Sequence, residues 1–157
     1  MILPLFYSIN ISAFDYIIDA HGKREVIKSY SISDDEKYLH FILEGTFTDN
    51  LGNYGVWDNA STLILQGKNV INFQGYDKST FQNNEVMYSK GFRNRQEQQA
   101  RVGQIVVVNA SNFLKVLLEM NCTYAVNFYL DNAYFIQKCK ITDEQKKVLG
   151  SVSKMKE

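Results

Sequence analysis

Residues 121–141 read NCTYAVNFYLDNAYFIQKCKI, and this stretch decides the fold. In its first half, apolar side chains alternate with mostly polar ones, which is the two-residue period of a half-buried strand. The second half has the same period, interrupted at Gln137. A tight turn near Asp131 and Asn132 joins the halves in our interpretation, so the sequence predicts an antiparallel hairpin.

This hairpin carries the only two cysteines of the chain, Cys122 and Cys139. The predicted turn places both on the inward face, within about one residue pair of each other. One interpretation is a disulfide that closes a loop of about 17 residues and stabilises the fold by roughly 3 kcal/mol. The other is a pair of small buried thiols without a role. The opposed placement favours the disulfide.

Composition indicates one ordinary globular domain. The chain has 157 residues, of which 45% are hydrophobic and 22% charged, enough apolar material to bury a core. Seventeen basic residues balance seventeen acidic ones, which argues against a nucleic-acid partner. We assign residues 14–150 to a single barrel-like domain and residues 151–157 to a polar tail.

The remaining strands follow the same alternation. Residues 38–48 give the clearest pattern, with Leu39, Phe41, Leu43, Gly45 and Phe47 on one face. Residues 14–20 and 24–32 are predicted as two strands joined by a turn at His21 and Gly22. Residues 54–66 form the next strand, and a break in alternation at Asp58 and Asn59 suggests a bulge. Further strands are expected at 70–75, 86–92 and 104–108, with a polar loop at 76–85.

Two short helices are expected in the C-terminal half. Residues 111–120 have an apolar stripe and a serine suited to the N-cap, Ser111. Thr142 and Gln145 match a capping box that opens a terminal helix to about residue 149. About eight antiparallel strands joined mostly by short turns predict an all-β domain with minor helix. The favoured form is a meander closed, or nearly closed, into a barrel, with a sandwich as the alternative.

The first thirteen residues have two interpretations. They contain no charge and end in Ile11, Ser12 and Ala13, which resembles an apolar signal segment before a small-x-small cleavage site. No Lys or Arg precedes the apolar run, as a complete signal would require. The alternative is a first strand. Together with the cysteine pair, this segment favours a secreted or periplasmic location, and otherwise a cytoplasmic one.

The sequence contains no familiar catalytic or metal-binding motif. The two histidines, His21 and His40, and the two cysteines lack the spacing of a zinc or iron site, and we predict no metal and no cofactor. Neither a nucleophile elbow nor a phosphate loop is present. A basic cluster at Lys90, Arg93, Arg95 and Arg101 is better explained as a solvated loop.

Aromatic side chains offer the candidates for a ligand site. Trp57 is the single tryptophan, and it could form an aromatic wall at a barrel mouth with Tyr38 or Tyr124. Packing in the core is the favoured alternative for Trp57. The predicted shape is similar to small ligand-binding barrels such as lipocalins, although their opening Gly-x-Trp motif is missing.

Three functions remain open at this level. The leading hypothesis is a non-catalytic, exported module that binds a small, largely apolar ligand in the barrel. The second is an enzyme of cyclase or isomerase type, which requires a Glu, Asp or Tyr pointing into a cavity. The third is a structural or protein-interaction domain, which requires a large exposed apolar patch. The sequence contains no apolar stretch long enough to span a bilayer as a helix, and it leaves oligomeric state undetermined.

Overall fold

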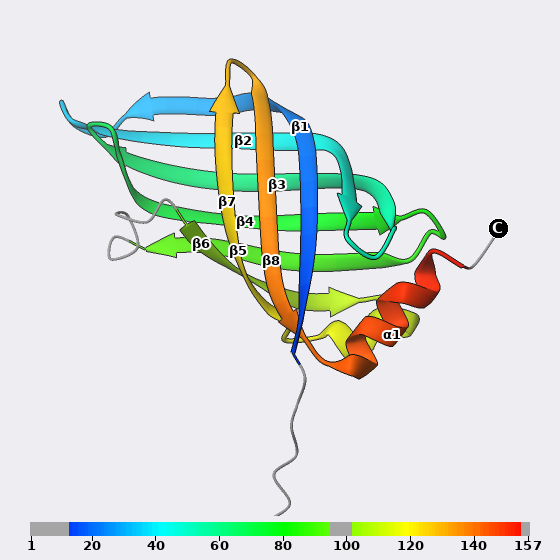
Figure 1. Ribbon diagram of the computed structural model, residues 1–157. Helices are drawn as coiled ribbons and strands as arrows, with labels where there is room; N and C mark the ends of the chain where they lie inside the picture. The colour runs from blue at the N-terminus through cyan, green and yellow to red at the C-terminus, as the bar shows by residue number, and fades with distance from the viewer. Residues whose placement is uncertain (1–12, 95–101, 155–157) are drawn as a thin grey trace, which may run out of the picture.

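Eight antiparallel strands form one closed barrel in the computed structural model, which describes residues 13–94 and 102–154. Each strand pairs with the next along the chain, and the last pairs with the first, so the meander predicted from the sequence is confirmed (Figure 1). The strands are β1 (Phe14–Ser31), β2 (Glu36–Asp49), β3 (Tyr54–Gln66), β4 (Asn69–Phe81), β5 (Val86–Asn94), β6 (Val102–Ala110), β7 (Asn121–Tyr129) and β8 (Asn132–Ile141).

Two short helices pack at one end of the barrel. The 3-10 helix η2 (Asn112–Leu117) replaces the longer helix predicted over 111–120, and α1 (Asp143–Val152) follows β8. Figure 1 shows α1 at the end where β2 turns into β3. Leu114 and Leu117 from η2 and Leu149 and Val152 from α1 are fully buried there. This end of the barrel is therefore filled by apolar side chains, and we call it the closed end.

The start of α1 is fixed by the capping box expected from the sequence. The Thr142 side chain accepts a hydrogen bond from the Gln145 backbone N–H, and the Gln145 side chain accepts one from the Thr142 backbone. These reciprocal bonds satisfy two donors that a helix N-terminus otherwise leaves open. The Gln145 side chain also donates to the Val116 carbonyl, which ties α1 to η2.

A carboxylate organises the polar contacts at the closed end. Asp49, at the end of β2, accepts hydrogen bonds from the Tyr16 hydroxyl at 2.7 Å and from the Asn53 side chain at 2.7 Å. It also accepts from the backbone N–H groups of Leu51 and Asn53. Asn53 in turn donates to the Leu149 carbonyl of α1 at 3.1 Å. Asp49 thus joins β1 to the β2–β3 turn, and Asn53 joins that turn to α1.

The first strand differs from the prediction. The structure has no turn at His21 and Gly22, because β1 continues as one strand of 18 residues. Gly22 instead pairs with Gly45 on β2, where the two backbones approach closely. A Cβ on Gly45 would lie 1.9 Å from the His21 carbonyl oxygen. The glycine that suggested a turn is therefore needed for close approach of neighbouring strands.

Two corrections concern β3 and β4. No bulge occurs at Asp58 and Asn59, since β3 pairs in unbroken register with both neighbours there. The inward positions of β3 continue from Trp57 to Asn59 and Ser61, which are all buried. The polar loop predicted over 76–85 is also wrong in its first half, because β4 runs to Phe81. Both errors arose where polar side chains face the barrel interior.

The cysteine hairpin forms as predicted, with its turn moved by one residue. Tyr129 pairs with Asn132, so Leu130 and Asp131 form the turn, and Leu130 has a positive φ of 54°. Cys122 and Cys139 are directly opposite each other and are joined by a disulfide. The buried Gln137 amide donates towards both sulfurs, at 3.2 and 3.4 Å.

The other sequence expectations have mixed outcomes. The inward face predicted for residues 38–48 is confirmed by the burial of Phe41, Leu43 and Phe47. The expected signal segment or first strand over residues 1–13 lies almost wholly outside the described residues, as do Arg95 and Arg101 of the basic cluster. Among the helices that the structure describes, none is long and apolar enough to cross a bilayer.

Candidate functional site

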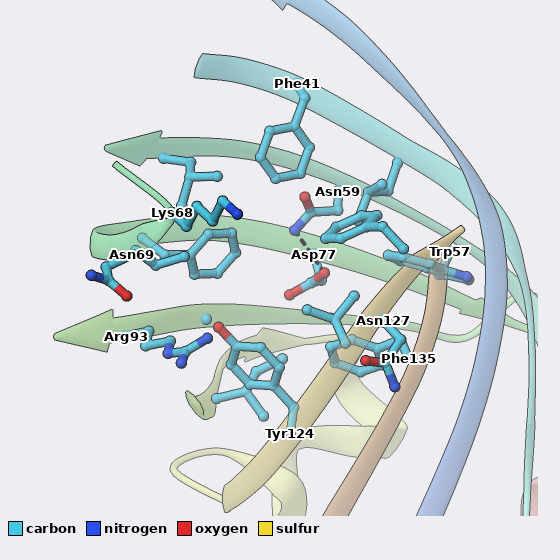
Figure 2. Close-up of a pocket in the computed structure, with 18 residues that line it drawn as sticks. Phe41, Trp57, Asn59, Lys68, Asn69, Asp77, Arg93, Tyr124, Asn127 and Phe135 are labelled. Atoms are coloured by element: carbon cyan, nitrogen blue, oxygen red, sulfur yellow. Dashed lines mark hydrogen bonds between the residues drawn. The ribbon is translucent and has the colours of Figure 1, made fainter. Parts of the chain in front are cut away.

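A cavity of about 550 Å³ occupies the barrel interior at the end away from α1. Lys68 and Asn69 of the β3–β4 turn line it, and Lys68 is exposed, so we call this the open end. Figure 2 shows Lys68, Asn69 and Arg93 on one side of the cavity and Trp57 and Phe135 on the other. Most of the remaining wall is apolar or aromatic, contributed by Phe41, Leu43, Leu63, Val70, Phe73, Ile105, Tyr124, Val126 and Phe128.

Among the residues that the structure describes, one carboxyl group lies in the wall of this cavity, that of Asp77 on β4. Its partner in the β3–β4 ladder is Asn59, which shares the inward face. The Asn59 amide donates to Asp77 Oδ1 at 2.9 Å, and Asn59 Oδ1 accepts from the Ser61 hydroxyl at 2.5 Å. Because Ser61 holds the amide oxygen, the amide nitrogen is directed at the carboxyl (Figure 2).

Poor solvation raises the pKa of the Asp77 carboxyl group. The Asp77 side chain is half-buried, and it lines the wall of the cavity. This poor solvation, offset by the Asn59 hydrogen bond and reinforced by the nearby charge of Asp58, raises the pKa of Asp77 to about 7. The carboxyl can therefore exist in either protonation state near neutral pH.

A glycine leaves open space beside the carboxyl. Gly91 on β5 lines the cavity, and a Cβ added there would lie 4.0 Å from Asp77 Oδ2, at ordinary contact distance. The same atom would lie 3.8 Å from the Tyr124 ring and 3.6 Å from the Phe73 ring. The missing side chain thus leaves Oδ2 facing a space bounded by two aromatic rings.

A second, smaller cavity lies on the other side of Asp77. Its volume is about 20 Å³, enough for one water molecule. Ser79, Ser89 and Gln137 contribute polar groups to its wall, and Trp57 and Ile18 contribute apolar ones. Asp77 therefore borders both the large open cavity and a small space with a mixed apolar and polar lining.

Two of the three aromatic candidates come together in the cavity. Phe135 lies between Trp57 and Tyr124, with ring centroids 5.9 Å and 5.3 Å away, and forms a stack with both. Tyr124 lies over Gly103, where a Cβ would approach its ring to 2.3 Å. Tyr38 does not line the cavity. It stacks on Tyr30 of β1 at 4.9 Å, in the part of the β1–β2 hairpin that extends beyond β8.

Sequence reasoning missed Asp77, Asn59 and Ser61. The sequence pattern predicts a loop at Asp77 and a bulge at Asn59, whereas both residues lie in regularly paired strands. A usable signal existed in the inward series Trp57, Asn59, Ser61 and Leu63, where two polar residues keep the strand period. Polar residues at inward positions of a strand need partners inside the barrel.

Metal ligands do not cluster in the described part of the chain. No group of three or more His, Cys, Asp or Glu side chains is close enough there to hold an ion. The chemistry available at the cavity is that of a carboxyl group, amides, aromatic rings and the cations Lys68 and Arg93.

Comparison with known proteins gives a fold relationship and no more. No protein-family model matches the chain, and no curated protein matches it by sequence. The structure is similar to a solved structure described as an enzyme from Penicillium herquei, with a TM-score of 0.56 and 8% sequence identity. The similarity covers 82% of this chain and 93% of that one. At this identity the likeness concerns the barrel alone, so the cavity must be interpreted from its own residues.

Proposed function

We propose that this protein binds a small, largely apolar molecule inside its barrel. The observation that carries the proposal is the cavity of about 550 Å³ at the open end. That volume lies within the range of pockets that enclose drug-sized ligands, and its lining combines an apolar wall with a few convergent polar groups, as such pockets do. A barrel packed solidly with side chains, like the closed end, would have contradicted the hypothesis.

The single tryptophan provides a direct test. Trp57 is the single tryptophan, is only 5% exposed and lies in the cavity wall, so its fluorescence reports on the barrel interior. Titration with a panel of aryl ketones and medium-chain fatty acids should change its emission saturably. A Gly91→Leu variant places a side chain in the cavity and should abolish the change. Gly150→Leu is the matched control, because an added Cβ meets nothing within 4 Å there.

Two results would contradict the proposal. One is that no member of the panel alters Trp57 emission. The other is that Gly91→Leu, folded as judged by circular dichroism, binds as well as Gly150→Leu does.

A second candidate is an enzyme of cyclase or isomerase type, and Asp77 favours it. Such an enzyme needs an acid–base group pointing into a cavity. Glu44 faces solvent and does not qualify, whereas Asp77 lies in the cavity wall. The structural neighbour described as an enzyme supports this candidate only at the level of a shared barrel. A third candidate, a protein-interaction domain, rests on exposed apolar side chains such as Tyr129, Leu130 and Tyr134 of the β7–β8 hairpin.

We also propose that the protein is exported. The Cys122–Cys139 disulfide supports this, because such bonds persist in oxidising compartments. Intact mass measured on protein from its native source, with and without reductant, tests it. Export predicts an oxidised pair and loss of the N-terminal segment. A reduced, full-length chain in a cytosolic fraction would contradict it.

A further inference from the structure

We propose that Asp77 transfers protons to and from carbon in this barrel, and that its substrates are largely apolar carbonyl compounds with an acidic C–H next to the carbonyl group. This inference rests on the proposed binding of small molecules in the cavity, and it assigns a residue and a substrate class to the second candidate function.

The two oxygens of the Asp77 carboxyl group have different surroundings. One carboxyl oxygen is fixed by Asn59, whose amide is itself oriented by Ser61. The other oxygen faces the space beside Gly91 within the large cavity. A molecule in that space can approach Oδ2 without displacing the groups that hold Oδ1. Asn59 and Ser61 are therefore positioning residues, and Asp77 is the group that touches the substrate.

The surroundings match the chemistry of carbon acids. A carboxylate in water is too weak a base for efficient proton abstraction from carbon, and an apolar cavity raises its basicity towards neutrality. The pKa of about 7 for Asp77 agrees with this requirement. Among the described residues, the other charged or titratable side chains around the cavity and behind it are Asp58, Lys68, Arg93 and Tyr124.

The side chains that line the cavity indicate the substrate class. Aromatic rings of Phe73, Tyr124 and Phe135 bound the cavity near Asp77, which favours a planar or aromatic body. A carbonyl group is required because it accepts the electron pair released when the neighbouring C–H bond breaks.

The step is balanced without a further reactant. The Asp77 carboxylate takes the proton, the C–H pair becomes a C=C bond, and the carbonyl π pair moves to oxygen to give an enolate. Return of the proton to the same carbon regenerates the substrate. Return to a different carbon of a conjugated system gives an isomer with a moved double bond. Nothing is oxidised or reduced in either case.

Exchange of hydrogen for deuterium is the direct measurement. Phenylacetone and β-tetralone are incubated with the protein in D₂O, and loss of the signal of the hydrogens next to the carbonyl is followed by proton NMR. We expect the wild-type protein to accelerate exchange over buffer alone, with a rate that rises with pH through a midpoint near pH 7 to a plateau. Asp77→Asn should lower the protein-dependent rate roughly 100-fold or more.

Two matched variants separate a chemical role from a structural one. Asp19→Asn, an equivalent change at an exposed position on β1, should leave the rate unchanged. Asn59→Ala removes the hydrogen bond that stabilises the carboxylate, so the midpoint of the pH profile should move upward. A merely structural role for Asn59 would lower the rate without moving that midpoint.

Failure of this inference can be told from failure of binding. If the ketones change Trp57 emission but wild-type protein does not accelerate exchange, binding stands and proton transfer is wrong. Exchange that is equally fast in a folded Asp77→Asn variant would also overturn the assignment. If no ketone alters Trp57 emission and none is exchanged, the ligand class proposed here is wrong, while binding of the fatty acids would still support the cavity as a site.

Discussion

The side-chain amide of Asn59 donates a hydrogen bond of 2.9 Å to the carboxyl of Asp77 across the β3–β4 ladder, inside the barrel. This bond favours the charged form of Asp77, while burial favours the neutral form, and burial has the larger effect. The balance between them has consequences for stability as well as for chemistry.

Asp77 should make the protein less stable as pH rises. Its pKa is about 7 in the folded protein and near 3.8 in an unfolded chain, so the folded state binds more protons between these values. The stabilisation is complete below about pH 4 and is lost as pH rises through about 7. We expect a loss on the order of 4 kcal/mol, which Asp77→Asn abolishes. Urea unfolding of both proteins at a series of pH values measures it. Parallel pH profiles for variant and wild type would contradict the expectation.

The charge of Asp58, on the outside of the barrel, should influence the pKa of Asp77. Asp58 is exposed on β3 next to Asn59, and its charge raises the pKa of Asp77. Asp58→Asn should therefore lower that pKa, and by less in high salt because ions screen the interaction. The pH dependence of the infrared band of the protonated carboxyl measures the change. Asp19→Asn serves as control, and an unchanged midpoint in Asp58→Asn at low salt would show that Asp58 has no influence.

The disulfide should stabilise the last hairpin strongly. Cys122 and Cys139 are separated by 17 residues, so the cross-link removes roughly 3 kcal/mol of loop entropy from the unfolded chain. Replacing both cysteines by alanine should lower the free energy of unfolding by about that amount and leave the barrel closed. Guanidinium denaturation, monitored by circular dichroism, measures the loss. If wild-type stability is the same with and without reductant, the bond contributes nothing.

Tyr16 should matter for stability and not for ligand binding. Its hydroxyl donates to Asp49 at the closed end, whereas the cavity lies at the open end. Tyr16→Phe removes one donor from a carboxylate, which should cost about 1–3 kcal/mol. Tyr76→Phe, at an exposed position, is the control for loss of a hydroxyl. Thermal denaturation measures stability and Trp57 emission measures binding, and a large change in ligand affinity would contradict the separation of the two ends.

The barrel was predictable because most of its strands bury one face. Strand β2 alternates cleanly between apolar and polar side chains, and the hairpin of β7 and β8 does so with one exception. The turns and helix caps also follow local rules, as Thr142 and Gln145 illustrate. Local sequence is informative wherever one face meets the core and the other meets solvent.

The site was not predictable for the same reason. Asn59, Ser61 and Asp77 are polar residues that face inward. A prediction that expects every inward-facing residue to be apolar assigns such residues to a bulge or a loop. Ser61 bonds Asn59 on its own strand, but Asn59 and Asp77 lie on neighbouring strands, 18 residues apart in the sequence. Only the register of β3 against β4 brings them together. The turn predicted at Gly22 was wrong for a similar reason, because the role of this glycine depends on Gly45 on another strand.

The division of the barrel into a packed end and a hollow end has a consequence for the evolution of such a protein. Substitutions around the cavity alter which molecules fit, and they leave Leu114, Leu117, Leu149 and Val152 in place at the other end. Descendants could therefore exchange one ligand for another while the chain continues to fold. The same property makes this barrel a suitable starting scaffold for directed evolution, with Gly91 as the first position to randomise.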